Sequence, residues 1–225
     1  MMARSTSRLL LHTGAALALC SLASAQAATL QMTVLAADGK PLADAVVVVE
    51  PKSPDTPRKA APVQATIQQE KMRFVPALIV VPAGSRVRFT NLDSYEHHVR
   101  GRPADAGLLD TTAANSGFEL RLGAATEGRG GGSQEVVMTQ AGAVELGCHV
   151  HSVMRGHIFV AGTPWVAKTD ASGVATLGDV PEGAAQVRVW HADQLLPAAP
   201  VAVNVGANST LNLPTQVLPR GKSRR

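Results

Sequence analysis

The sequence predicts an all-β protein, and three observations lead to this fold class. Valine-rich runs alternate apolar with polar residues, turns rich in Gly, Pro and Asp separate these runs, and no long segment holds the apolar period of about 3.6 residues that marks a helix. Strands therefore account for the regular structure that we expect in the mature chain.

The first strands belong to a short N-terminal segment. Leu30, Met32 and Val34 alternate with polar or small residues, and an Asp-Gly-Lys-Pro turn at 38–41 leads to a second strand at 45–49, which together predict a hairpin. The segment 51–62 carries four prolines and charges of both signs. We therefore predict an extended linker at residues 53–65.

A second block of strands begins at about Thr66. Its clearest runs are 72–76, 78–81, 87–89 and 136–138, while the stretch 100–133 is irregular and its glycines at 130–132 predict a mobile loop. The last run ends in Val144, Leu146 and Cys148, which share one face because strand side chains alternate. The thiol of Cys148 is thus expected to point inward.

After residue 160 the sequence returns to short valine-rich strands with Asp-Gly and Pro-x-Gly turns, at 187–190, 201–205 and 211–213. A hairpin alone is too small to be stable, so we expect these strands to bury its apolar face. The prediction is one β-sandwich split into residues 28–52 and 163–214 by an inserted domain at 66–162. A basic disordered tail at 215–225 follows.

The N-terminus predicts export. Residues 1–27 combine Arg4 and Arg8 with an apolar run at 9–22 and a small-x-small site at 25–27, the pattern of a cleaved signal peptide. No run of about 18 apolar residues predicts a membrane span. A lipoprotein signal at Cys20 is an alternative that Leu19 disfavours. We expect a periplasmic protein, and no aromatic-studded basic groove suggests nucleic acid binding.

The mature chain keeps a single cysteine, because the sequence has two and Cys20 leaves with the signal. Cys148 is then an intermolecular cystine, an inert buried thiol, a reactive nucleophile or a metal ligand. His151 and Met154 follow it at Cys-x2-His-x2-Met spacing, which favours a metal. Thiolate, imidazole and a weak thioether are the donors of a mononuclear copper electron-transfer centre, whereas thioether is a poor zinc ligand. A further donor must come from His97 or His98.

Two motifs resemble those of the cupredoxins, most closely amicyanin and its plastocyanin-like relatives, including those labelled methylamine utilisation proteins. Val-x-Phe-x-Asn ends at Asn91, six residues before His97, and Cys148 opens the motif Cys-x2-His-x2-Met-x-Gly. The resemblance covers residues 66–162. It implies a Greek-key β-sandwich that holds one type 1 copper ion through His97, Cys148, His151 and Met154.

This chain departs from the cupredoxin pattern at three positions. His98 stands where relatives carry Asn, so it rivals His97 as a ligand, although the spacing from Asn91 favours His97. Val150 replaces a Pro and Leu146 replaces a Tyr, changes that we expect to affect loop stiffness and potential more than metal identity. His149 and His157 are expected on the surface.

The outer segments resemble the carboxypeptidase regulatory-like, transthyretin-like β-sandwich. Residues 29–52 carry its Asp-Gly-x-Pro-Leu-x-x-Ala-x-Val pattern and residues 163–214 its Thr-Asp-x-x-Gly and Pro-x-Gly turns. Trp165 and Trp190 are expected to pack in the core of this second sandwich.

These inferences predict a periplasmic type 1 copper protein that carries single electrons between a donor and an acceptor protein and is not an enzyme. In the cupredoxins the loop histidine has a solvent-exposed edge, so the resemblance implies that electrons leave through His151. The alternatives are a copper-binding or storage protein without electron transfer, and an interaction module whose copper site has degenerated. A cysteine enzyme lacks the oriented partner that a Cys–His pair requires.

Overall fold

The protein is described from a computed structural model, over residues 27–52, 59–104, 117–127 and 129–219. Every regular element in these ranges is a strand, so the all-β prediction is confirmed. The same ranges contain no helix of the length and hydropathy that a membrane crossing requires. The predicted signal peptide lies outside them except for Ala27, which opens the first strand.

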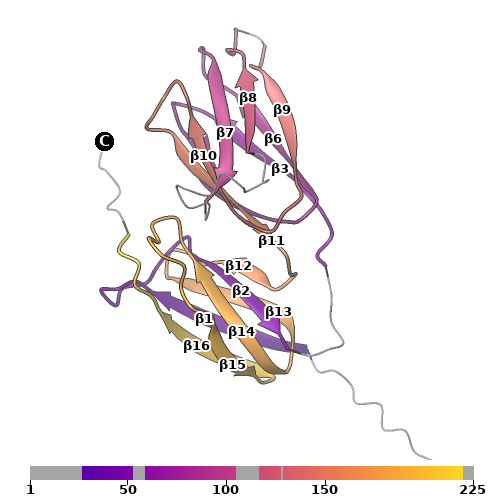
Figure 1. Cartoon of the computed structure of the whole chain (residues 1–225), viewed down its shortest axis with the longest axis vertical. Coiled ribbons are helices and arrows are strands. Elements are labelled where there is room, and N and C mark those ends of the chain that lie inside the picture. Colours follow the sequence, from indigo (N-terminus) through magenta and orange to yellow (C-terminus); the bar gives the residue numbers. More distant parts are fainter. Residues whose placement is uncertain (1–26, 53–58, 105–116, 128, 220–225) are drawn as a thin grey trace, which may run out of the picture.

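A three-stranded sheet and a four-stranded sheet, built from the outer segments of the chain, form one sandwich, which we call the second sandwich (Figure 1). The first has the order β13-β1-β16, with β13 at Val174–Pro181, β1 at Ala27–Leu35 and β16 at Asn208–Pro214. The second has the order β12-β2-β14-β15, with β12 at Val166–Lys168, β2 at Val46–Pro51, β14 at Gly183–Trp190 and β15 at Val201–Val205. Leu30, Met32, Val47 and Val187 meet in the core between these sheets.

The remaining strands form another sandwich, which we call the metal-site sandwich. One sheet has the order β5-β11-β10-β7-β8, made of Leu78–Pro82, Arg155–Ala161, Gly142–Cys148, His97–Pro103 and Phe118–Leu122. The other has the order β4-β3-β6-β9, made of Phe74–Val75, Gln64–Gln69, Ser85–Asn91 and Ser133–Met138. Phe89, Leu122 and Ile158 fill the core between them.

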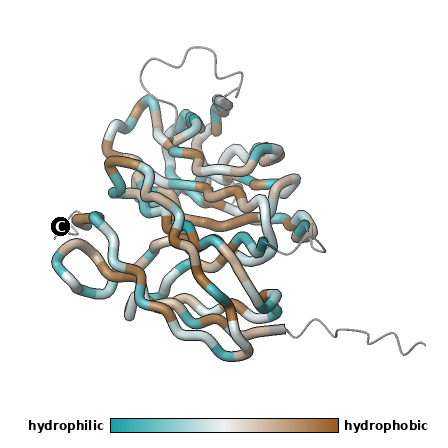
Figure 2. Tube along the Cα trace, turned by 60° about the horizontal axis from the view of Figure 1, so that its bottom comes forward, coloured by the Kyte–Doolittle hydropathy of each residue, from teal (hydrophilic) through white to brown (hydrophobic). Residues whose placement is uncertain are grey.

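The two sandwiches pack against each other through a small apolar cluster, so that the four sheets stack in layers. Val46 and Val48 of β2 turn away from their own core and meet Leu78 of β5. Since Val47 and Val49 point into that core, all four valines are buried, as expected of a strand covered on both faces. Brown apolar segments accordingly run through the middle of the molecule in Figure 2.

The aromatic part of this contact corrects two expectations. The Trp190 ring lies 5.4 Å from that of His157 and 5.6 Å from that of Phe159, so Trp190 packs between the sandwiches and not in the core of the second one. His157 is half-buried against it rather than a free surface residue. Trp165, by contrast, does lie in the second core.

The predicted N-terminal hairpin is wrong. β1 pairs with β13 and β16, whereas β2 pairs with β12 and β14, so the two strands lie in opposite sheets. The chain crosses between the sheets at residues 36–45, where the buried Thr169 hydroxyl donates to the Leu42 carbonyl and accepts from the Ala45 amide. Alternation identifies which face of a strand is buried and not which strand is its neighbour.

Two boundaries also differ from those expected. β3 begins at Gln64, inside the predicted linker, because it pairs in parallel with β6 from Arg86 onward. The predicted tail is packed at its start, since Val217 is buried in the second core and accepts a bond from the Ala37 amide. Residues 220–225 lie outside the described ranges.

The glycine cluster expected to be a mobile loop is packed instead. The Gly131 amide donates to the Asn91 carbonyl, and the Gly132 amide to that of Gly123. A Cβ at Gly131 would lie 2.5 Å from the Asn91 oxygen, so the close approach requires glycine there.

Candidate metal centre

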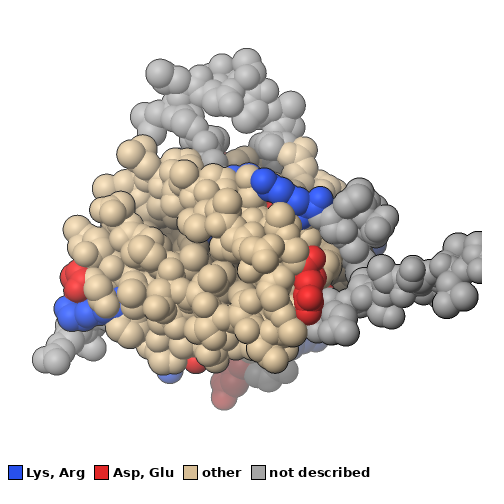
Figure 3. Space-filling model, turned by 90° about the horizontal axis from the view of Figure 1, so that it is seen from below, with Lys and Arg blue, Asp and Glu red and all other residues tan. Residues whose placement is uncertain are grey.

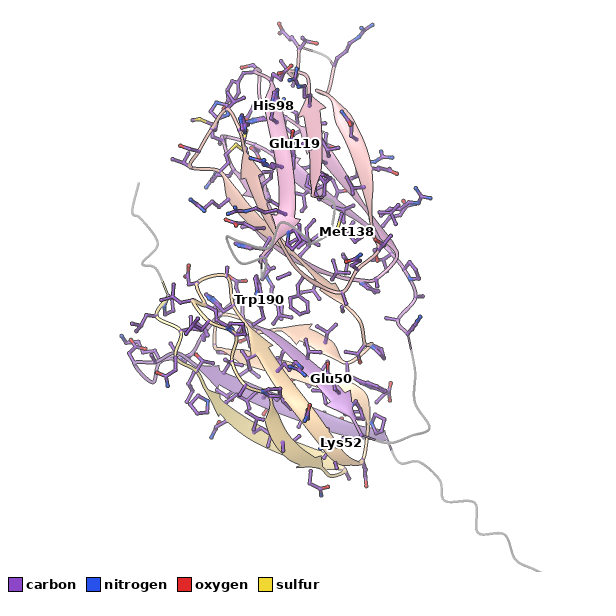
Figure 4. All side chains as sticks on the ribbon, in the orientation of Figure 1. Glu50, Lys52, His98, Glu119, Met138 and Trp190 are labelled. Carbon is purple, nitrogen blue, oxygen red and sulfur yellow. The ribbon has the colours of Figure 1, made fainter. Side chains whose placement is uncertain are left out.

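The candidate centre lies at the end of the metal-site sandwich that is far from the second sandwich. β7 starts there with His97 and His98, and β10 ends there at Cys148. In Figure 4, His98 lies near this end and Trp190 lies between the two sandwiches.

Asn91 fixes the loop that leads to His97. Its fully buried side chain donates from Nδ2 to the carbonyls of Tyr95 (2.7 Å) and Gly123 (3.0 Å) and accepts from the Asp93 amide at 2.8 Å. A third carbonyl, that of Leu122, lies at 3.2 Å. Because one side chain satisfies several backbone groups across two loops, the position of the following histidine is set before any metal binds.

Two nitrogens of His97 have different roles. Its Nε2 lies 2.9 Å from Asp93 Oδ2, and its Nδ1 lies 3.6 Å from Cys148 Sγ. Since a carboxylate only accepts, the ring donates from Nε2 and keeps the lone pair of Nδ1 toward the sulfur. Carboxylates orient metal-binding histidines in this way. The imidazole is completely buried, which also keeps water from its ring.

Asp93 is itself held by the backbone. Its two carboxylate oxygens accept from the Lys71 amide at 2.6 Å and the Met72 amide at 3.1 Å. Burial alone would raise the pKa of Asp93, but the hydrogen bonds from His97, Met72 and Lys71 outweigh it and hold this pKa below its usual value. The carboxylate is therefore ionised and available to His97.

The loop between β10 and β11 brings in the second imidazole. Cys148 Sγ lies 3.8 Å from His151 Nδ1, and the Met154 amide donates to the His151 carbonyl at 3.0 Å, which closes the loop. One donor atom from each of His97, Cys148 and His151 lies within 4.8 Å of the others. The predicted residues from two distant segments thus meet.

The spacing of these atoms suits a metal ion. Metal–nitrogen and metal–sulfur bonds of about 2.1 and 2.3 Å, meeting at a trigonal angle, would separate the donors by about 3.8 Å. The two observed nitrogen–sulfur separations are 3.6 and 3.8 Å. Two imidazoles and one thiolate are also the donor set that copper takes in electron-transfer sites.

Met154 and His98 differ in how they relate to this group. Met154 is 1% exposed and belongs to the same core cluster as Cys148, so its side chain is buried in the core that also holds the thiol. His98 points the other way, and its Nε2 lies 2.8 Å from Oε1 of the exposed Glu96. Of the two adjacent histidines, only His97 is brought to the cysteine.

Sequence reasoning missed two residues of the centre. Asp93 orients His97, and the ring of Tyr95 lies 5.2 Å from both the His97 and the His151 rings. Burial and the nearby negative charge of Asp93 raise the pKa of Tyr95, so its hydroxyl stays neutral. The sequence did carry one signal for both residues. Asp93 and Tyr95 lie between Asn91 and His97, in a loop so short that its side chains must lie near the ligand.

Residues 61–161 match the family described as copper binding proteins of the plastocyanin/azurin family. The chain therefore contains a cupredoxin domain that binds type 1 copper, as the resemblance predicted for residues 66–162, and the match begins slightly earlier. The comparison with curated proteins gave no match. The transthyretin-like character of the second sandwich stays a prediction.

Several solved structures are similar to part of the chain. A purple cupredoxin from Nitrosopumilus maritimus is 20% identical over 43% of this chain and 99% of its own, with a TM-score of 0.34. Amicyanin from Paracoccus versutus is 21% identical over 51% of this chain and 97% of its own, with the same TM-score. A copper-containing nitrite reductase from Thermus scotoductus is 20% identical over 50% of this chain, which spans only 25% of that enzyme, again at 0.34.

Proposed function

We propose that this chain, whose residues 61–161 form a copper-binding cupredoxin domain, carries single electrons between a donor and an acceptor protein in the periplasm. The observation that carries the proposal is the convergence of one donor atom each from His97, Cys148 and His151 within 4.8 Å. We assign these three residues as the copper ligands, with Met154 as a weak fourth.

The bound copper would supply a one-electron couple, and the protein's part is to hold its ligands still. His97 is fixed through Asp93, and Asp93 through two backbone amides. Cys148 is 7% exposed and Met154 is 1% exposed, so the surrounding core keeps water away from both sulfurs. Ligands that are fixed in advance reorganise little when the charge of the site changes, which is what rapid electron transfer requires.

His151 is proposed as the point of electron exit. It is half-buried, while its loop neighbours Val150 and Val153 are 56% and 65% exposed and Leu92 of the other loop is 41% exposed. A partner that covers these apolar side chains would approach the imidazole directly, since large exposed apolar groups mark interaction sites.

The remaining parts of the proposal concern the rest of the chain. We assign residues 1–27 as a cleaved signal peptide, the source of the periplasmic location. Residues 28–52 and 163–214 are proposed as a second, transthyretin-like domain, joined by a linker and followed by a basic tail. The protein is proposed to pass electrons without transforming a substrate, because His97, Cys148 and Met154 are buried and only His151 is half-buried.

One experiment separates a carrier from a storage protein. The mature protein is loaded with one equivalent of copper, and its voltammogram and its electron self-exchange, followed by NMR line broadening in mixtures of the two oxidation states, are recorded. A carrier gives one reversible one-electron wave and fast self-exchange. An irreversible wave, or release of copper on reduction, would leave only copper binding.

The matched control is Val150→Asp. This substitution leaves the ligands unchanged but adds a charge to the apolar surface beside His151, so self-exchange through that surface slows whereas the potential moves little. Equal self-exchange in both proteins would remove His151 as the exit.

A further inference from the structure

The outer face of the metal-site sandwich carries three arginines around one glycine. In the sheet register Gly147 of β10 lies between Arg100 of β7 and Arg155 of β11, and Arg102 is the next outward residue of β7. Each arginine side chain is between 55% and 65% exposed. The end of the molecule formed by the second sandwich, by contrast, shows few charged residues (Figure 3).

The missing side chain of Gly147 leaves a hollow between these arginines. Its volume is about 160 Å³, and its lining includes Arg100, Arg102, Glu145, Arg155, Cys148 and Met154. A Cβ built on Gly147 meets nothing within 4 Å, so the space above this residue is open. The hollow therefore leads from the basic surface to the backbone beside the thiol.

The charges around the hollow do not cancel. Glu145 is shared by two guanidinium groups, at 2.6 Å from Arg102 and 3.0 Å from Arg155. Among the described residues Arg100 has one ion-pair partner, Glu119, at 3.2 Å, and the Glu119 side chain is 73% exposed. Three positive groups and one negative group thus line the hollow, and guanidinium forks are suited to carboxylates.

We propose that this hollow is the docking site for a carboxylate side chain on the acidic surface of a redox partner, and that electrons enter there, through the Gly147–Cys148 backbone. The inference rests on the proposed electron-carrier function. It gives the domain two separate contacts: an apolar one beside His151 and a basic one behind Cys148. In this transfer the partner would be oxidised by one electron, copper held by the assigned ligands would accept that electron, and no bond or proton would change place.

The size of a carboxylate group fits the hollow, and the long-range field of the arginines would gather acidic partners before contact. Such steering raises association rates by roughly 10- to 1,000-fold and weakens as salt is added. Binding and electron entry are thus both expected to depend on these arginines and on ionic strength.

The first test is binding, read by NMR amide shifts on the reduced and on the copper-free protein. The probe is the redox-inert anion hexacyanocobaltate(III), and a decaglutamate peptide is the competitor. We expect shifts at Gly147 and Arg100, competition by the peptide, and binding at least about tenfold weaker in Arg100→Gln/Arg155→Gln. The control Arg86→Gln/Arg88→Gln removes two exposed arginines from β6, on the opposite sheet.

The second test is electron entry, measured by stopped flow with the anion ferrocyanide as the electron donor to the oxidised protein. Gly147→Val keeps every charge and fills the hollow, so it should slow ferrocyanide about tenfold, with an unchanged visible spectrum. The cationic donor hexaammineruthenium(II) should react at an unchanged rate with Gly147→Val and with Arg100→Gln/Arg155→Gln.

Some outcomes overturn this proposal. One is equal anion binding by the β6 control and by the Arg100→Gln/Arg155→Gln variant. Another is a Gly147→Val protein that ferrocyanide reduces as fast as the unsubstituted protein. Inorganic phosphate that competes as well as decaglutamate at equal ionic strength would make the hollow a free-anion site instead. Failure of the electron-carrier function would appear separately, as a missing reversible wave with anion binding to the copper-free protein retained.

Discussion

The two sandwiches have similar apolar cores but bury polar groups for different purposes. In the second sandwich the buried polar residues are Thr169 and His191, and both serve nearby backbone: Thr169 bonds at the crossover between sheets, and His191 accepts from the Asp193 amide. The metal-site sandwich also buries Gln69 and Ser85, but its Asn91, Asp93 and His97 are buried together within one loop. Their bonds run to one another and end at Cys148.

The difference teaches where chemistry is placed on a β-sandwich. Burying a carboxylate and an imidazole costs free energy unless each is paired, so a chain of mutual hydrogen bonds at one end of a core marks a functional site. A sandwich whose buried polar groups only close its own turns serves as a scaffold.

The largest effect is expected from core substitutions that compare the two sandwiches. Leu30 and Ile158 are both 0% exposed, one in each core. Leu30→Ala and Ile158→Ala should each lower the free energy of unfolding by about 2–5 kcal/mol, measured by urea denaturation. Only Ile158→Ala should also alter the visible copper spectrum. A changed spectrum in Leu30→Ala would mean that the second sandwich shapes the metal site.

The next largest effect is expected at Asn91. Asn91→Ala leaves three carbonyls and one amide without their partner, so we expect a loss of about 3 kcal/mol in unfolding free energy and slower, weaker copper uptake. The control is Asn204→Ala, an exposed position on β15. Equal stability of the two variants would show that the Asn91 bonds do not hold the ligand loop.

Asp93→Asn tests whether a carboxylate is required behind His97. The amide has the same shape but no charge, so His97 should be oriented less firmly and copper affinity should fall about 10- to 100-fold. Competition with a copper chelator measures this loss. The matched control is Glu96→Gln, which removes the exposed carboxylate paired with His98. If Glu96→Gln weakened copper as much as Asp93→Asn, His98 would be the ligand.

The smallest effect is expected at the contact between the sandwiches. Burial against Trp190 lowers the pKa of His157 below its usual value of about 6.5. Because the unfolded chain then binds the proton more tightly, His157 contributes stability above pH 6.5 that is lost as pH falls toward its folded pKa. Urea unfolding at pH 7.5 and 5.5 should give a smaller difference in His157→Gln.

The exposed control for this comparison is His149→Gln, which removes an imidazole from the metal-site end of the molecule and leaves the contact between the sandwiches as it is. His191, whose pKa burial also lowers, supplies a remaining slope of the same sign in both variants. A His157→Gln protein with the full pH dependence would show that protonation does not weaken the contact between the sandwiches.

Much of the site was predictable because its signals are local. Cys148, His151 and Met154 lie close together in the sequence. The spacing from Asn91 favoured His97 over His98, and adjacent side chains of a strand point in opposite directions. The place of Asp93 between Asn91 and His97 indicated that it lies near the ligand but not its role, because only the folded loop brings its carboxylate to Nε2 of His97. Neither charge nor periodicity distinguishes it from an ordinary turn residue.

The fold shows the same limit. Alternation of apolar and polar residues identified the strands and their buried faces. It did not identify their partners, and β1 was wrongly predicted to pair with β2 because strands that are neighbours in the sequence most simply form a hairpin. The run of four valines in β2 did carry a signal for burial on both faces, and the second covered face is the contact with the metal-site sandwich. The place of Trp190 depends on that contact, which no single-strand pattern encodes.

The most direct test of the central claim is the visible spectrum of the mature protein after addition of one equivalent of Cu(II). We predict an intense thiolate-to-copper charge-transfer band that is lost in Cys148→Ser, bleached in His97→Ala and retained in His98→Ala. A colourless copper complex, or a band that survives His97→Ala and is lost in His98→Ala, would contradict the centre described here.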